Sequence, residues 1–151
     1  MKPHLLEQYK FNFWANERLI NFIDSEELQT KQIHSILSHL TFAQVTWLDR
    51  ISGSSSFEDN NEWLQWSWDD VRDKCLESSH QLVQLIDKHE DFDLVVKYSN
   101  TSGTEHERSV GHILTHLLHS TSFHRGQAVG NIHQGENMMT PSFDFIDFIN
   151  S

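Results

Sequence analysis

The stretch from Val110 to Gln134 constrains the fold of this 151-residue chain more than any other. A helix turns by about 100° per residue, so residues spaced by three, four and seven positions come to lie on one side of it. The spacing predicts a long amphipathic helix whose apolar side faces a core. Its apolar residues fall within about 60° of one direction, and they are Val110, Ile113, Leu114, Leu117, Ala128 and Ile132.

This predicted helix also holds five of the chain's eleven histidines. His124 falls on the apolar side, whereas His112 and His119 point to the opposite side and His116 lies at the edge. We therefore expect one inward histidine and several in contact with solvent.

Length, charge and cysteine content limit the class of protein. A chain of 151 residues suits a single domain, residues 1–151. Its formal charge of -11 and its scattered Lys and Arg residues disfavour binding to nucleic acid or anionic lipid. No apolar run approaches the ~20 residues of a membrane span, and the first residues lack the apolar segment of a secretory signal. The lone cysteine, Cys75, fits a reducing compartment, so we expect a cytoplasmic protein.

Apolar spacing predicts three further helices, over about residues 3–25, 30–52 and 68–89. Pro3 suits the start of the first, the hydroxyl of Thr30 can cap the second, and Gly53 suits its end. Residues 54–61 combine Ser, Asn and acidic groups without periodicity, which predicts an exposed connection followed by a short helical turn near residues 62–66.

The segment before the last helix has a different pattern. Residues 92–98 are rich in β-prone side chains and residues 100–103 are typical of a turn, so either a short hairpin or an extended connection is expected. In the tail, the apolar groups of residues 142–149 must be covered by the bundle or by a second subunit. Four amphipathic helices with one longer mixed connection before the last predict an all-α four-helix bundle.

Histidine is the main source of chemistry in this sequence. The usual motifs of a Ser-His-Asp or Cys-His nucleophile, a Gly-rich phosphate loop and a di-iron bundle are all missing. Cys75 lies in the apolar register of the third helix, which favours a buried packing residue. His39, at the edge of the apolar stripe of the second helix, could approach one ion together with His124. Spacing alone favours the other interpretation, in which each is a core histidine satisfied by hydrogen bonds.

Five segments of the chain form a recognisable set. They are YKFNFWANERL at residues 9–19, HLTFAQVTWL at 39–48, the run at 98–103, ILTHLLHSTSFHRGQ at 113–127, and Pro141 with DFI at 144–146. Together they resemble the DinB family of DNA-damage-inducible, YfiT-like four-helix proteins. The resemblance spans nearly the whole chain and implies a bundle of the DinB type.

The resemblance also implies a divalent metal ion, Ni²⁺ or Zn²⁺. Its ligands would be a histidine of the second helix and an H-x-x-x-H pair that ends at H-R-G-Q, which correspond here to His39, position 120 and His124. Position 120 is Ser120, and a neutral hydroxyl is a poor ligand for these ions. Either two histidines hold the ion with waters or a substrate group, or the site is a hydrogen-bonded pocket without metal.

Further side chains of this region are candidate pocket residues, namely Ser120, His116, Arg125 and Gln127. The resemblance implies structural roles for the run after His124. Arg125 would pair with a carboxylate, Gly126 would allow close approach of a helix, and Gln127 would bond nearby polar groups.

Two classes of function follow from the resemblance. The first is a metal-dependent enzyme, a thiol S-transferase or hydrolase-like protein acting on a small-molecule substrate in a stress response. The alternative is a non-catalytic bundle with a degenerate metal site that binds a small molecule. In either class we expect a homodimer formed through apolar helix faces and the tail.

Overall fold

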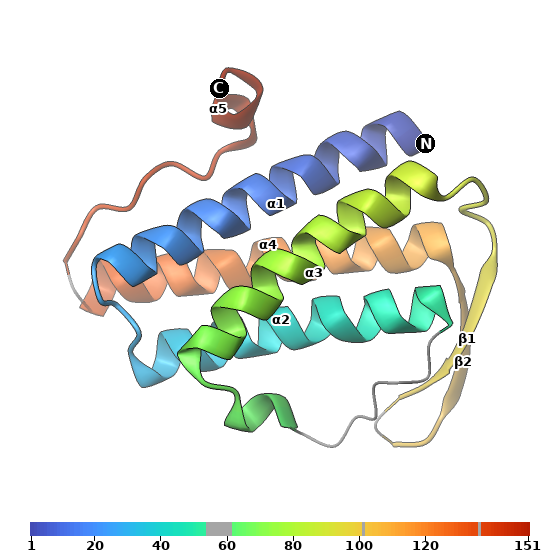
Figure 1. Ribbon diagram of the computed structural model, residues 1–151, viewed down its shortest axis with the longest axis horizontal. Coiled ribbons are helices and arrows are strands. Elements are labelled where there is room, and N and C mark those ends of the chain that lie inside the picture. The colour runs from blue at the N-terminus through green and yellow to red at the C-terminus, as the bar shows by residue number, and fades with distance from the viewer. Residues whose placement is uncertain (54–61, 101, 136) are drawn as a thin grey trace.

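Four long helices form a bundle, as Figure 1 shows, which confirms the predicted fold class. The computed structural model describes residues 1–53, 62–100, 102–135 and 137–151, so the predicted connection at 54–61 lies outside the described residues. The long helices are α1 (Lys2–Ser25), α2 (Lys31–Ser52), α3 (Trp68–Lys88) and α4 (Val110–Gly135). The short elements are η1 (Glu62–Gln65), β1 (Val95–Ser99), β2 (Glu105–Ser109) and α5 (Phe145–Ile149).

The helix ends follow from local side-chain chemistry. Thr30 Oγ1 accepts a hydrogen bond from the amide of Ile33 at 3.3 Å, which caps α2 as predicted. Gly53 ends α2 with a φ of 70°, a conformation that glycine adopts without strain. Ser67 and Asp70 form a reciprocal capping box at the start of α3.

Helix α2 packs against both α3 and α4, which run in opposite directions. In Figure 1, α1 and α4 run from right to left, whereas α2 and α3 run from left to right. Helix α2 therefore packs antiparallel to α4 and parallel to α3, and α1 covers α3. The antiparallel hairpin of β1 and β2 lies at the end of the bundle where α2 finishes and α4 begins. Of the two predicted forms of this connection, the structure has the hairpin.

The core consists of two apolar halves. One half lies toward the end of α1 and the start of α2 and includes Leu19, Ile33 and Ala128. The other half lies toward the hairpin and includes Tyr9 and Leu114, whose side-chain hydroxyl and main-chain carbonyl are joined by a hydrogen bond of 2.9 Å. All six residues of the apolar stripe predicted for α4 are buried in these halves.

A buried polar layer separates the two apolar halves, and every long helix contributes to it. The amide of Gln44 on α2 donates to the hydroxyls of Ser78 and Ser79 on α3, at 2.9 and 3.0 Å. Its oxygen accepts from Asn12 and Asn16 on α1, both at 3.2 Å. A buried amide satisfied on both sides specifies how the helices are aligned.

Arg125 brings α4 into this layer. Its side chain is only 5% exposed and donates to the amide oxygens of Asn12 and Asn16 at 3.0 and 2.8 Å. Burial lowers the pKa of Arg125 to about 10, so the guanidinium is still charged at neutral pH. The expectation that Arg125 pairs with a carboxylate is wrong, because its partners are the neutral amides of Asn12 and Asn16 and the hydroxyl of Ser122.

Two further expectations concern Gly126 and Cys75. A methyl group at Gly126 would meet nothing within 4 Å, so this glycine does not allow close approach of a helix, contrary to the expectation. The close approach occurs at Gly111, where a methyl group would lie 3.3 Å from the carbonyl oxygen of Phe92. Cys75 is buried as predicted, and burial raises the pKa of its thiol to about 11. At neutral pH it is therefore a protonated packing residue.

The tail packs on α1. Phe145 of α5 contacts Phe11 with ring centroids 5.2 Å apart, and Phe148 contacts Trp14 at 5.8 Å. Figure 1 shows α5 beside α1. The bundle thus covers the aromatic groups of the tail, whereas the side chain of Ile146 is 62% exposed.

The two helical glycines predict opposite effects of substitution. Gly126→Ala should raise the free energy of unfolding by about 0.5–1 kcal/mol, because alanine favours the helix and the site has room. Gly111→Ala, the matched control, should gain less or lose stability because the Phe92 carbonyl must move. Urea denaturation of both variants measures the difference, and equal gains would contradict the assignment of Gly111 as the position of close approach.

The buried polar layer predicts a large effect at Arg125. Arg125→Met should lower the free energy of unfolding by about 2–4 kcal/mol, because it leaves the amide oxygens of Asn12 and Asn16 buried without this donor. Arg18→Met is the control, since Arg18 is exposed and lies over the ring of Trp14, and it should cost less than about 1 kcal/mol. Similar losses in the two variants, measured by urea denaturation, would refute this role of Arg125.

Candidate functional site

Two of the predicted site residues meet across the seam between α2 and α4. The ring centroids of His39 and His124 lie 4.7 Å apart, with an angle of 75° between the ring planes. His39 is exposed and His124 is partly buried, so the pair lies at the edge of the bundle. His124 was expected to point into the core, but the buried polar group of this turn is its neighbour Arg125. We call His39, His124, Trp63 and Gln127 the histidine-pair site.

Gln127 fixes the orientation of His124, in agreement with the expectation that Gln127 bonds a nearby polar group. The distance between Nδ1 of His124 and Oε1 of Gln127 is 2.8 Å. The oxygen of an amide accepts hydrogen bonds and cannot donate them, so Nδ1 of His124 carries the proton of this bond. In the neutral ring Nε2 then keeps its lone pair. The arrangement is typical of a histidine that is held through one ring nitrogen and binds a ligand through the other.

His39 is held in an environment that favours its neutral form. Although His39 is exposed as a residue, partial burial of its ring lowers its pKa below the ordinary value, and the charge of His124 does so to a lesser extent. The indole of Trp63 lies against it at 5.5 Å between centroids, and Phe42 contacts Trp63 in turn at 5.4 Å. Phe42 was not singled out in the sequence, although it lies three residues after His39, the spacing of neighbours on a helix face.

The other candidates are not part of this pair. Ser120 lies one turn before His124 and is partly buried. His116 is exposed and lies about 12 Å from His124 toward the start of the helix, where the centroids of its ring and of Trp47 are 6.0 Å apart. Arg125 points into the polar layer of the core instead.

The side chains at this site fall short of a three-ligand metal centre. Within residues 1–53, 62–100, 102–135 and 137–151, no group of three His, Cys, Asp or Glu side chains is placed to hold an ion. His39 and His124 supply two nitrogen donors, and Ser120 adds only a neutral hydroxyl. A catalytic zinc site typically has three protein ligands, so the described donors do not fit the ion that the family resemblance implies.

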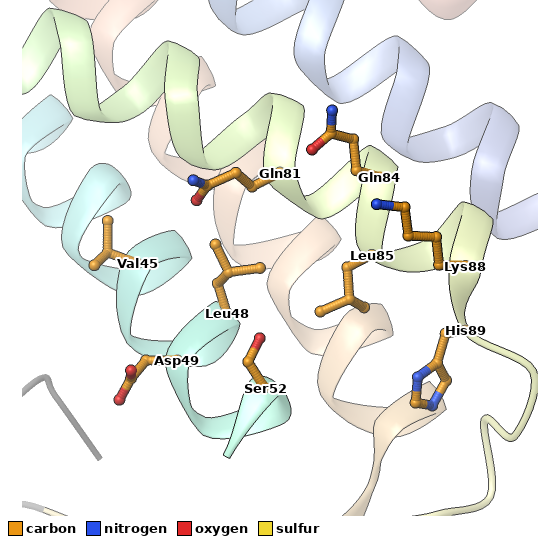
Figure 2. A pocket seen from close by; sticks show the side chains of 9 residues that line it. All are labelled: Val45, Leu48, Asp49, Ser52, Gln81, Gln84, Leu85, Lys88 and His89. Atoms are coloured by element: carbon orange, nitrogen blue, oxygen red, sulfur yellow. The ribbon is translucent and has the colours of Figure 1, made fainter. Parts of the chain in front are cut away.

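A wide hollow lies on the opposite side of α2, between α2 and α3, as Figure 2 shows. It has a volume of about 610 Å³ and mixes apolar walls such as Leu48 and Leu85 with the opposite charges of Asp49 and Lys88. None of the candidate site residues predicted from the sequence lines it. The histidine-pair site, in contrast, brings two of them together, His39 and His124.

A smaller pocket lies between the hairpin and the helices. Trp47, Tyr98, Arg108 and His112 line it together with His116, and its volume is about 310 Å³. Sequence reasoning identified His116 but not Arg108 or His112 as pocket residues. The alternation of side chains in β2 could have indicated Arg108, because every second residue of a strand faces the same side.

The described part of the chain contains no helix that is both long and apolar enough to cross a membrane. Comparisons with known proteins point to one family. The model of the DinB family matches residues 1–149. The chain is 19% identical over 160 aligned residues to "Protein DinB" of Bacillus subtilis (strain 168), covering 94% of this chain and 92% of that protein. No solved structure matches the chain significantly. The family predicted from the five sequence segments is confirmed.

The contact between the two histidines predicts a linked titration. In a histidine NMR titration, His39 should titrate below pH 6.5, and His124→Gln should move its pKa part of the way back up. His119→Gln, an exposed change on the same helix, is the control and should leave His39 unchanged. No response to His124→Gln would show that the two rings are not in contact.

The sign of the effect on stability follows from the same shift. Because the pKa of His39 is lower in the folded than in the unfolded chain, the unfolded chain binds more protons on acidification. The contribution of His39 is therefore constant above about pH 6.5 and is lost as the pH falls below that value.

Proposed function

The chain belongs to the DinB family, and on that premise we propose that it binds a small organic molecule at the histidine-pair site without metal catalysis. The observation that carries the proposal is the contact of His39 with His124 beside Trp63. At this place the described side chains offer a metal ion two nitrogen ligands and no third His, Cys, Asp or Glu. A role in a stress response, expected from the family resemblance, is part of this proposal.

The chemistry of the pair suits a polar, planar ligand. A neutral imidazole offers one N–H donor and one lone pair, so His39 and the free Nε2 of His124 can donate to or accept from such a molecule. The indole of Trp63 gives an apolar surface against which a flat group can stack. Most small-molecule sites combine aromatic walls with a few placed polar groups in this way.

A second candidate function is a metal-dependent thiol S-transferase or hydrolase-like enzyme. The contact of Gln127 with Nδ1 of His124 favours it, because this contact leaves Nε2 directed for an ion. A divalent ion at such a site supplies Lewis-acid activation of a bound thiol or water. The candidate needs a third ligand beyond those that the described residues supply.

Homodimer formation also belongs to the proposal. Ile146 and Ile149 of α5 are 62% and 47% exposed. Exposed apolar groups of this kind are typical of surfaces that contact another chain.

Metal content separates the two candidate functions. Our proposal predicts that protein purified without chelator and soaked in Ni²⁺ or Zn²⁺ retains less than a stoichiometric ion, by mass spectrometry. Ser120→His should then gain about one ion per chain, because it adds a third nitrogen one turn before His124. The double variant Ser120→His with His124→Ala is the matched control and should lose that ion.

The opposite result would support the enzyme. A wild-type protein that holds about one ion per chain, lost in His124→Ala, would overturn the metal-free proposal. Assays of thiol transfer and hydrolysis with the loaded protein would then follow.

A further inference from the structure

The pocket between the hairpin and the helices has a charge that contrasts with the rest of the chain. We call it the hairpin pocket, and its lining residues are Trp47, Tyr98, Arg108, His112, Ile113 and His116. The chain as a whole has a formal charge of -11. The lining nevertheless contains an arginine and two histidines and no carboxylate.

The pairing of β1 with β2 explains this separation of charge. Val96 is opposite Arg108 and Tyr98 is opposite His106, and the side chains of these paired residues share one face of the hairpin. Val96 is buried, so this face is the one turned toward the bundle.

The acidic residues of the hairpin are on its other face. Glu105 and Glu107 alternate with His106 and Arg108 along β2, so their carboxylates point away from the pocket. Glu107 forms an ion pair with Lys97 at 3.0 Å on this outer face. The alternation thus removes negative charge from the pocket even though β2 itself carries two glutamates.

Arg108 is held at the pocket without an acidic partner. Its Nη1 donates to the main-chain oxygen of Glu107, and among the described residues no carboxylate lies within ion-pair distance of its guanidinium. Arg72, in contrast, lies 2.9 Å from the carboxylates of both Asp69 and Asp73. A guanidinium with donors to spare, beside a concave surface, suits the two oxygens of a carboxylate.

We propose that the hairpin pocket binds the carboxylate of a small aromatic acid. Arg108 pairs with the carboxylate, the ring N–H groups of His112 and His116 donate to it, and Trp47 and Ile113 contact the aromatic ring. The volume of about 310 Å³ suits a ligand with a single ring. The inference rests on the proposed function, because it names an aromatic acid as the class of small molecule that binds along the seam between α2 and α4.

The hairpin pocket lies along the same seam between α2 and α4 as the histidine-pair site. Trp47 and His116 lie eight residues from His39 and His124 respectively, which is two turns or about 12 Å along each helix. A larger aromatic acid could reach from one site to the other. The hollow of Figure 2 does not offer this arrangement, because it lies on the other side of α2 and the acidic Asp49 lines it together with Lys88.

The test is a titration of the full chain with benzoate, followed by amide NMR shifts and by calorimetry in the presence of chelator. Benzamide is the matched neutral compound. We expect saturable benzoate binding with shifts centred on β2 and the start of α4, and much weaker binding of benzamide. Arg108→Gln should weaken benzoate binding by about tenfold or more. Arg18→Gln removes the same charge from a remote surface and should leave it unchanged.

The outcomes separate this inference from the proposed function. Equal binding of benzoate and benzamide, or no effect of Arg108→Gln in a variant with an unchanged thermal midpoint, would overturn the carboxylate site. Benzoate binding that chelator abolishes would overturn it too, since the acid would then be a metal ligand. If the wild type proves to hold a stoichiometric ion while chelator-resistant binding still depends on Arg108, the carboxylate site stands and the metal-free proposal falls.

Discussion

The hydrogen bonds of Arg125 to Asn12 and Asn16 are the interaction on which the arrangement of the four helices depends. A charged group buried in a core is costly unless its donors are satisfied, and here the acceptors are amide oxygens of α1. The same asparagines donate to Gln44, which extends the network to α2 and α3. Apolar packing alone tolerates some rotation of a helix, whereas these directional bonds permit only one alignment.

This alignment also orients the candidate site. Residues next to each other on a helix point about 100° apart. With Arg125 directed into the polar layer, its neighbour His124 is turned toward α2, where it meets His39. The histidine pair is therefore a consequence of the core network, and Gln127 adds the local contact that sets the ring of His124.

The sequence is informative about the fold because its signals are local. Helix ends could be predicted from Thr30 and Gly53, and the buried stripe of α4 from spacing alone, since both depend on residues within a few turns. The partners of Arg125 could not be predicted in this way. They are on α1, more than one hundred positions away, and an arginine before a glycine gives no sign that it will bond to amides.

The candidate site was predicted in part for the same reason. The motif around His124 indicated the pair with His39, yet periodicity alone placed His124 in the core, because an average over a long helix cannot separate the side chain at position 124 from that at 125. The hairpin pocket depends on register, because a shift of one residue would exchange Arg108 for Glu107 at its wall. Spacing within β2 shows the alternation but not which face meets the bundle.

The polar layer bears on the departure at position 120 as well. In a bundle held together by a metal ion, loss of a ligand would weaken the fold along with the site. Here Gln44, Asn16 and Arg125 join the long helices at their centre, and none of them belongs to the set of metal ligands that the family resemblance implies. Serine at position 120 is therefore compatible with an intact scaffold. The seam between α2 and α4 can change its chemistry without loss of the fold, which is the condition that a ligand site without metal requires.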